Sequence, residues 1–125
     1  MKRYDVAALG EVLIDFTRSG ESEQGNPLFE ANPGGAQGSR AYYGDLTVFE
    51  PACARGGVIE TTGAGDTFCG CVLDFVLGHG LEGLREDELR AMLRFANTAA
   101  WFVTTRKGAI RAMPDPSEVE RILRD

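Results

Sequence analysis

A short stretch near the middle of the chain combines small residues with a carboxylate in an order that suits chemistry on an anion. It reads Thr61-Thr62-Gly63-Ala64-Gly65-Asp66-Thr67-Phe68, and an almost wholly apolar run follows it as far as Leu77. This run predicts a buried helix that begins near Gly65. The first turn of a helix has backbone N–H groups without intrahelical partners and carries partial positive charge. Because residues 63–65 have little or no side chain, an anionic group can approach those N–H groups closely.

The carboxylate of Asp66 would act as a base beside such an anion. An anion hole next to a base suits the transfer of a phosphoryl group to a hydroxyl. The stretch is not a Walker-type loop, because no Gly-Lys-Ser/Thr follows the glycines. The alternative is that Gly63 and Gly65 form only a turn, and that Asp66 is an ordinary carboxylate at a helix start.

Size, charge and hydropathy argue against several functional classes, among them nucleic-acid-binding and membrane proteins. The chain has 125 residues, room for one small domain, and its net charge of −6 with scattered basic residues argues against nucleic-acid binding. It contains no apolar run of about 20 residues, and its start lacks the apolar core of a signal peptide, so we expect a cytoplasmic protein without a membrane partner. Cys53, Cys69 and Cys71 are expected to be free thiols, and His79 a surface or capping residue.

The order of the predicted elements indicates an α/β fold. A first strand is expected at residues 4–9 and continues through residues 11–16, followed by a loop over the polar, glycine- and proline-rich residues 17–33. Residues 40–43 and 46–49 predict a hairpin that turns at Gly44-Asp45. A first helix should end at Gly78 and Gly80, and a second should run from Glu86 to about Val103 on helical spacing. Asp115 and Pro116 predict the start of a short third helix.

Three of these segments together resemble the PfkB (ribokinase-like) family of carbohydrate kinases. Residues 61–68 are similar to the family's second signature, and residues 8–16, Ala-Leu-Gly-Glu-Val-Leu-Ile-Asp-Phe, resemble the opening of its fructokinase-type members. Residues 32–36, Asn-Pro-Gly-Gly-Ala, resemble its first glycine-rich element. The resemblance implies a reduced mixed sheet, formed by residues 4–15 and 39–50 and packed by three helices. Such a fold would be a remnant of the ribokinase-like three-layer α/β/α architecture.

The resemblance breaks directly after the Gly34-Gly35 pair. Residues 37–43 are similar to the strand pair that precedes the second signature, so we expect the family's central region to be absent. On this interpretation residues 1–125 form a single truncated carbohydrate-kinase domain. Residues 1–36 would be its N-terminal sugar-site portion, and residues 37–125 its C-terminal portion with the anion hole and the catalytic aspartate.

The resemblance also implies an activity and a set of site residues. The activity would be ATP-dependent phosphoryl transfer to a sugar hydroxyl, most like that of a fructokinase, with ATP and Mg²⁺ and, at a monovalent cation site, K⁺. Asp66 would be the catalytic base, and the N–H groups of Gly63, Ala64 and Gly65 the anion hole. The carried-over binding residues are Asp15, Gly34 and Gly35 for the sugar, Asn97 for the nucleotide, and Glu60, Thr62, Val103, Arg106 and Gly108 for the monovalent cation.

Several of these assignments have structural alternatives in the sequence. Asp15 could equally be a solvated carboxylate at a strand end, and the Gly34-Gly35 segment a simple loop. Asn97 shares a helix face with Arg90, Arg94 and Trp101, which could equally be a solvated stripe. Glu60 stands where the family usually has Asp, a departure that bears on the cation site more than on catalysis.

A competing hypothesis is a catalytically inactive fragment that binds nucleotide weakly or associates with another chain. Removing the middle of a parallel sheet exposes strand edges and one face of each remaining helix. Self-association through those exposed edges is therefore expected on this hypothesis. The identity of the sugar is not predicted, because most specificity contacts would lie in the absent region.

Overall fold

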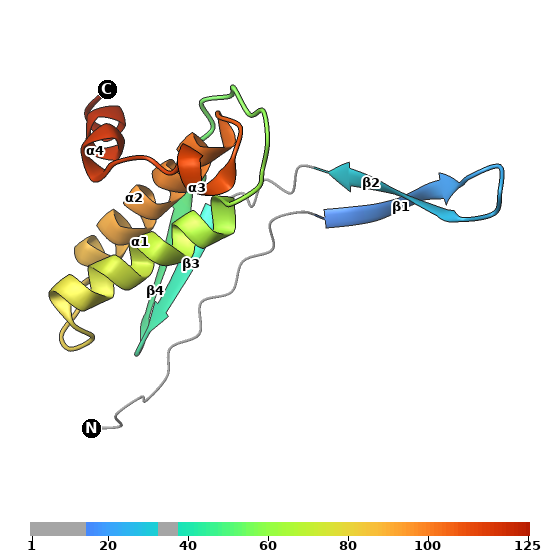
Figure 1. Cartoon of the computed structure of the whole chain (residues 1–125). Helices are drawn as coiled ribbons and strands as arrows, with labels where there is room; N and C mark the ends of the chain where they lie inside the picture. The colour runs from blue at the N-terminus through green and yellow to red at the C-terminus, as the bar shows by residue number, and fades with distance from the viewer. Residues whose placement is uncertain (1–14, 33–37) are drawn as a thin grey trace.

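The computed structural model describes residues 15–32 and 38–125, which form two antiparallel hairpins and four helices (Figure 1). The first hairpin pairs β1 (Asp15–Glu21) with β2 (Pro27–Asn32), and the second pairs β3 (Gly38–Tyr43) with β4 (Leu46–Pro51). The helices are α1 (Ala64–His79), α2 (Glu86–Thr104), the single-turn α3 (Ala109–Ala112) and α4 (Pro116–Arg124). None of these helices is both long and apolar enough to cross a membrane.

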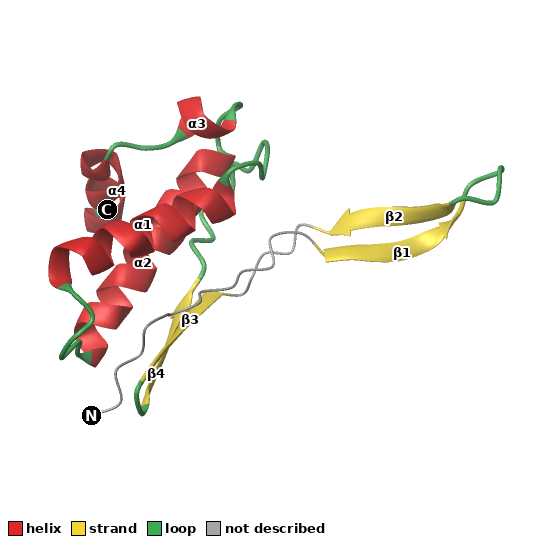
Figure 2. Cartoon of the chain, turned by 60° about the horizontal axis from the view of Figure 1, so that its bottom comes forward, coloured by secondary structure: helices red, strands yellow, loops and turns green. Residues whose placement is uncertain are grey.

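The β1–β2 hairpin corrects the prediction of a loop over residues 17–33. Its turn is closed by the N–H of Ser22, which donates to the carbonyl of Asn26 (2.8 Å), and by the N–H of Gly25, which donates to Ser22 (2.8 Å). The turn residues are therefore where the sequence places them, but the flanking residues pair as strands, with a register shift between Arg18 and Gly20. Figures 1 and 2 show this hairpin standing apart from the helices.

The second hairpin agrees with the prediction from its sequence. Tyr43 pairs with Leu46 across the turn, and Gly44 has the positive φ of 56° that such a tight turn favours. The hairpin buries Ala41 and Val48 against α1 and α2, where they join Phe68 and Leu93 in the main hydrophobic cluster. This two-layer packing of strands against helices confirms the α/β class. The described strands pair only antiparallel, and the strand expected at residues 4–9 lies outside the described residues.

Helix α2 is the centre of the packing, because it contacts α1, α3, α4 and both strands of the second hairpin. Its buried positions recur with helical spacing: Leu89, Met92, Leu93, Ala96, Ala99, Phe102 and Val103. The helix start is stabilised by the Glu88 carboxylate, which accepts the backbone N–H of Arg85 (2.9 Å). The apolar face predicted for residues 86–103 is thereby confirmed.

Helix α1 begins one residue before the predicted start and is capped at its end by Gly80, as expected. The expectation that it is buried along its length is wrong for the described residues. Its buried positions lie in the first turns, whereas Leu73 is 62% exposed and Leu77 is 86% exposed. One side of α1 packs on α2 and the other carries apolar side chains into solvent. His79 is exposed at the end of this helix and stacks on Phe75, as its expected surface position allows.

Candidate functional site

The start of α1 has backbone donors that no described residue satisfies. Gly63 is the N-cap, with φ 86° and ψ −2°, and its carbonyl accepts hydrogen bonds from the N–H (2.9 Å) and hydroxyl (2.8 Å) of Thr67. Among the residues that the structure describes, no acceptor lies in hydrogen-bond reach of the N–H groups of Gly63, Gly65 and Asp66. The N–H of Ala64 donates to the Thr61 carbonyl over a long 3.3 Å. Free N–H donors at the positive end of a 16-residue helix are groups of the kind to which anions bind in proteins.

The predicted anion hole and base are thus brought together in one helical turn. Asp66 is exposed in the first turn of α1, with its own N–H among the free donors. Ala64 and Gly65 are buried, so their backbone lies against the body of the protein while the carboxylate faces solvent. A carboxylate and backbone N–H donors that no described residue satisfies thus share one helical turn, a combination that suits phosphoryl transfer to a hydroxyl.

The loop after α2 lies against this helix start. A Cβ built on Gly63 would stand 2.9 Å from the Cβ of Ala109, the first residue of α3, so Gly63 and Ala109 are in direct contact. Earlier in the same loop, Arg106 is held by other contacts. Its guanidinium lies 4.2 Å from the centre of the Phe102 ring and 3.3 Å from the Glu118 carboxylate. Lys107 is exposed. The short helix α3, which the sequence did not reveal, is what seats this loop beside Gly63.

The residues expected to hold a monovalent cation lie on two neighbouring segments. The N–H groups of Ile59 (2.8 Å) and Glu60 (3.1 Å) both donate to the carbonyl of Thr104 at the end of α2. Glu60 therefore lies beside Val103, whose carbonyl accepts a long 3.4 Å bond from the N–H of Arg106. Among the described residues, no group of three or more His, Cys, Asp or Glu side chains is placed to hold a metal ion.

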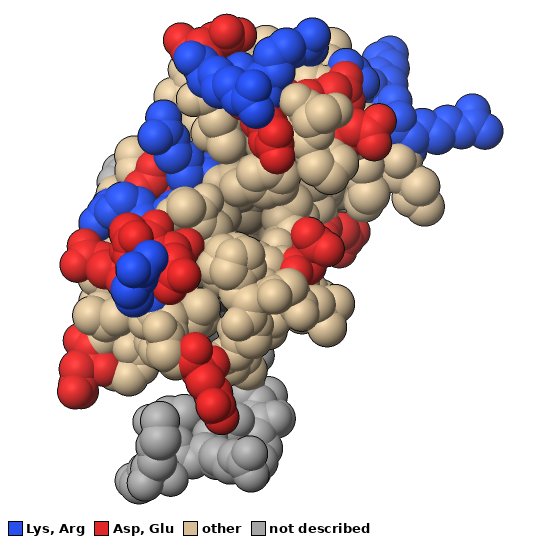
Figure 3. All heavy atoms as spheres, turned by 90° about the vertical axis from the view of Figure 1, so that its left-hand side faces the viewer, with Lys and Arg blue, Asp and Glu red and all other residues tan. Residues whose placement is uncertain are grey.

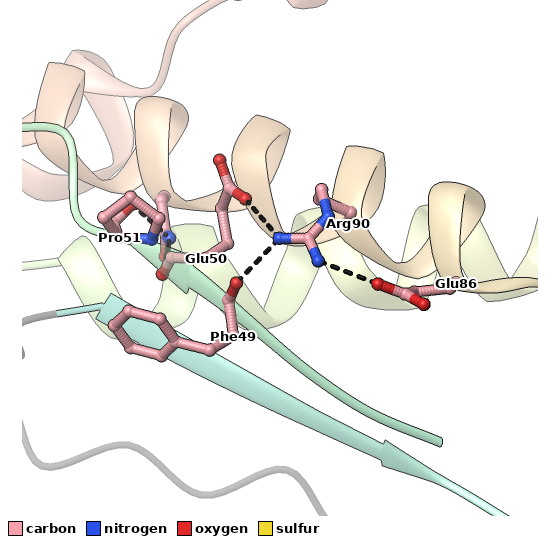
Figure 4. Close-up of polar contacts among 6 residues, drawn as sticks. Phe49, Glu50, Pro51, Glu86 and Arg90 are labelled. Carbon is pink, nitrogen blue, oxygen red and sulfur yellow. Dashed lines mark hydrogen bonds and ion pairs between the residues drawn. The ribbon is translucent and has the colours of Figure 1, made fainter.

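The polar face of α2 holds the end of β4 (Figure 4). Arg90 donates to the carbonyl of Phe49 (3.0 Å) and pairs with the carboxylates of Glu50 (3.5 Å) and Glu86 (2.9 Å). Two turns further on, the side-chain amide of Asn97 donates to the carbonyls of Glu50 (3.2 Å) and Pro51 (3.1 Å). This face is therefore a contact surface for β4, although the sequence left open a solvated stripe. Its i, i+7 spacing was visible in the sequence, but the partner strand was not.

A cleft of about 280 Å³ opens where α2, α4 and the segment after β4 meet. Asn97 and Thr98 line it from α2, and Ile122 and Leu123 line it from α4. The opposite wall is formed by residues 50–55, and Arg94 adds a cation. On the face drawn in Figure 3, acidic side chains lie among the basic ones, so neither sign of charge dominates that surface.

The residues expected to bind a sugar are not brought to this site by the described part of the chain. Asp15 opens β1, where its backbone pairs with Asn32, and the β1–β2 hairpin stands away from α1. Gly34 and Gly35 lie outside the described residues. Among the described residues, the structure therefore brings the free N–H donors and Asp66 into one helical turn, while the β1–β2 hairpin stands apart from them.

Comparisons with known proteins match about half of the chain. The probable fructokinase-4 of Arabidopsis thaliana is 44% identical over 68 residues, which are 53% of this chain and 20% of that protein. The chain thus spans about a fifth of the length of the curated relatives it matches.

Solved structures show the same relationship in three dimensions. A ribokinase of Arabidopsis thaliana, complexed with ribose and ATP, superposes with a TM-score of 0.58 at 34% identity, over 73% of this chain and 27% of that one. The aminoimidazole riboside kinase of Salmonella enterica, complexed with aminoimidazole riboside and an ATP analogue, gives a TM-score of 0.60 at 32% identity, over 73% of this chain and 30% of that one. These likenesses confirm the ribokinase-like fold.

The sequence profile of the pfkB family carbohydrate kinase matches residues 34–116, well over half of the chain. The matched range contains the whole of the second hairpin, both long helices and the helix start with its free N–H donors. This chain therefore belongs to the pfkB family of carbohydrate kinases.

Proposed function

We propose that this chain carries the phosphoryl-transfer site of an ATP-dependent sugar kinase, most like a fructokinase. The observation that carries the proposal is the cluster of free N–H donors at the start of α1 with Asp66 in the same turn. Family membership supports it, because the matched relatives include fructokinases and the superposed structures include kinases with ATP or an ATP analogue bound.

In this mechanism Asp66 takes the proton from the attacking sugar hydroxyl. The sugar oxygen forms a bond to the γ-phosphorus of ATP as the bond from that phosphorus to the bridging oxygen breaks, and ADP leaves. The N–H groups of Gly63 and Gly65 stabilise negative charge on the transferring group, and one preorganised donor of this kind is typically worth about 3 kcal/mol. Ala64 would contribute its N–H by giving up its long 3.3 Å bond to Thr61.

Magnesium would neutralise phosphate charge, and it would arrive on the phosphates of ATP. The lone carboxylate of Asp66 suits proton transfer better than it suits a metal cage, and the described residues offer no acidic cluster. A monovalent cation such as K⁺ would bind backbone carbonyls between residues 60–62 and the α2–α3 loop, where Glu60 and Val103 lie close together. Thr62, Arg106 and Gly108 complete the proposed ligand segments.

The nucleotide base would lie in the cleft beside Asn97. That cleft is apolar on the α4 side and polar on the α2 side, which suits a flat heterocycle. The amide nitrogen of Asn97 is engaged with β4, so the group left for a ligand is its side-chain oxygen.

The sugar would be held by Asp15, Gly34 and Gly35 from the N-terminal portion. This keeps the division into residues 1–36 for the sugar and residues 37–125 for phosphoryl transfer. It requires the β1–β2 hairpin to approach α1 more closely than in Figure 1.

The test is an assay of ADP release with ATP, magnesium and fructose, run beside the same mixture without sugar. We expect ADP release that depends on fructose, and ribose in place of fructose tests the sugar class. ADP release that is equal with and without either sugar would contradict the proposal. Binding of AMP-PNP with magnesium, measured by calorimetry, is a separate readout of the nucleotide site.

A second function, association with another chain, is favoured by the exposed side of α1. Leu73 and Leu77 lie one turn apart on that side, and such side chains are normally covered. On this alternative the chain binds nucleotide weakly, does not turn over, and pairs with a second copy through the open side of α1 and the free strand edges.

Sedimentation velocity, which measures the oligomeric state, tests whether the chain associates with a second copy. The wild type should sediment as a dimer, and the double variant Leu73→Gln, Leu77→Gln as a monomer. Ile110→Gln is the matched control, because Ile110 is 84% exposed on α3 rather than on α1. A wild-type chain that is monomeric at every concentration would contradict self-association.

A further inference from the structure

The segment that leads from β4 into the anion-binding turn is held by hydrogen bonds rather than by burial. We call residues 52–62 the connector. Every residue from 54 to 59 is exposed, and Val58 and Ile59 are 55% and 62% exposed. Gly56 and Gly57 both adopt positive φ, 74° and 75°, within this segment. Two consecutive glycines without packing give a chain little stiffness of its own.

The connector is tied to the helices at three points. Arg55 donates to the carbonyl of Ile122 on α4 (2.8 Å). The indole N–H of Trp101 donates to the carbonyl of Gly56 (2.8 Å), and the Thr104 carbonyl accepts the N–H groups of Ile59 and Glu60. The last tie lies three residues before Gly63. The position of the anion-binding turn therefore depends on these ties as well as on the contact of Gly63 with Ala109.

Of the three ties, the hydrogen bond from Trp101 is the one made to the glycine pair Gly56-Gly57. Trp101 follows Asn97 by one helical turn on the same face of α2, so the face that holds the end of β4 continues along the connector. Its ring is half-buried and meets Phe102 edge-on, with centroids 6.4 Å apart, while the indole N–H points to the Gly56 carbonyl.

We propose that Trp101 is a positioning residue for the proposed phosphoryl-transfer site. By holding Gly56, its indole N–H removes the freedom of the glycine pair and presets the turn at residues 63–66 for an anion. A preset turn binds its ligand without the cost of ordering it. This inference rests on the proposed function, since the bound anion is the phosphate chain of a nucleotide.

The variant that tests it is Trp101→Phe, which keeps an aromatic ring and removes the donor. The matched control is Tyr43→Phe, which removes the hydroxyl that donates to the Leu81 carbonyl (2.6 Å) in the loop between α1 and α2. Each variant removes one hydrogen bond from an aromatic side chain to a loop carbonyl. The loop that Tyr43 contacts lies at the C-terminal end of α1, whereas the anion-binding turn lies at its N-terminal end.

Two measurements are made on the full chain. Affinity for AMP-PNP with magnesium should fall about three- to tenfold in Trp101→Phe and stay unchanged in Tyr43→Phe. Amide hydrogen exchange without nucleotide should speed up at Ile59, Glu60 and Ala64 in Trp101→Phe, whereas in Tyr43→Phe it should change only around residues 81–84.

The outcomes separate the inference from the proposed function. If the wild type does not bind AMP-PNP, the proposed function fails, and exchange at Ile59, Glu60 and Ala64 still decides whether Trp101 holds the turn. Unchanged exchange in Trp101→Phe would overturn the inference. Faster exchange with unchanged affinity in a wild type that binds would overturn it too, because the tie would then not serve the site.

Discussion

Gly63 and Ala109 are in such close contact that neither can be replaced by a larger residue without displacing the other. The Cβ of Ala109 would lie 2.9 Å from a Cβ on Gly63, and its Cα would lie 3.2 Å away. This contact joins the start of α1 to the start of α3, two points separated in sequence by the whole of α1 and α2. It also explains why the N-cap is glycine, since the φ of 86° there disfavours any other residue.

Gly63→Ala should therefore lower the free energy of unfolding by about 2 kcal/mol, from positive-φ strain and overpacking together. Urea denaturation measures it. Gly70→Ala, inside α1 with nothing within 4 Å of the new Cβ, is the control and should be neutral or stabilising by up to about 1 kcal/mol. In the double variant Gly63→Ala, Ala109→Gly, only the part of the stability loss that comes from overpacking should be recovered. Full recovery would show that the φ of Gly63 carries no cost.

Asp66→Asn should lower kcat for sugar phosphorylation by about 100-fold or more, since it removes the proton acceptor and keeps the shape. Asp74→Asn is the control, because Asp74 is also exposed on α1 but lies two turns from the free N–H donors. Equal rates in the two variants would remove Asp66 from the mechanism.

Much of the C-terminal architecture was predictable because its signals are local. The turn at Gly44-Asp45, the helix stop at Gly80 and the Asp115 cap with its partner Glu118 each depend on a few neighbouring residues. The helix start at Ala64 and its free donors follow from the same kind of pattern. These elements are confirmed, and the catalytic role of residues 63–66 stays a prediction.

The contacts of the polar face of α2 could not be predicted, because they join residues far apart in the sequence. The sequence left open a solvated stripe at these positions, but β4 and the connector lie on them. Trp101 and Gly56 are 45 residues apart, so no local pattern indicates their hydrogen bond. The strands of the β1–β2 hairpin were hidden because residues 17–33 carry turn residues and no long apolar alternation.

Leu93→Ala should lower the free energy of unfolding by about 3 kcal/mol, because Leu93 is fully buried where α2 meets the second hairpin. Ile110→Ala deletes a side chain that is 84% exposed and should change it by less than about 0.5 kcal/mol. Thermal unfolding of both variants measures the difference. A small effect of Leu93→Ala would mean that the two layers pack loosely.

Glu118→Gln should make stability less sensitive to acid. The N–H of Asp115, which donates to the Glu118 carboxylate (3.0 Å), lowers the pKa of that group, and Arg106 lowers it further. A carboxyl with a lowered folded-state pKa stabilises the fold above its unfolded pKa, and that contribution is lost as the pH falls through the folded pKa. The variant should therefore be less stable at neutral pH and lose less stability below about pH 4.5.

Urea midpoints measured from neutral to acidic pH check this expectation. The control is Glu120→Gln, whose carboxylate pairs with exposed Arg124 one turn further on in α4 (3.2 Å). Its midpoints should run parallel to those of the wild type. Parallel curves for Glu118→Gln as well would mean that the capping box of α4 does not contribute to acid unfolding.

The hydrogen bond from Trp101 to Gly56 also makes the protein its own optical probe. Trp101 is the only tryptophan in the chain, and its indole N–H is bonded to the segment that leads into Gly63. Indole emission would therefore come from one place and respond when that segment shifts. The occupancy of the turn at residues 63–66 could be followed in the unmodified protein, without a dye or an engineered label.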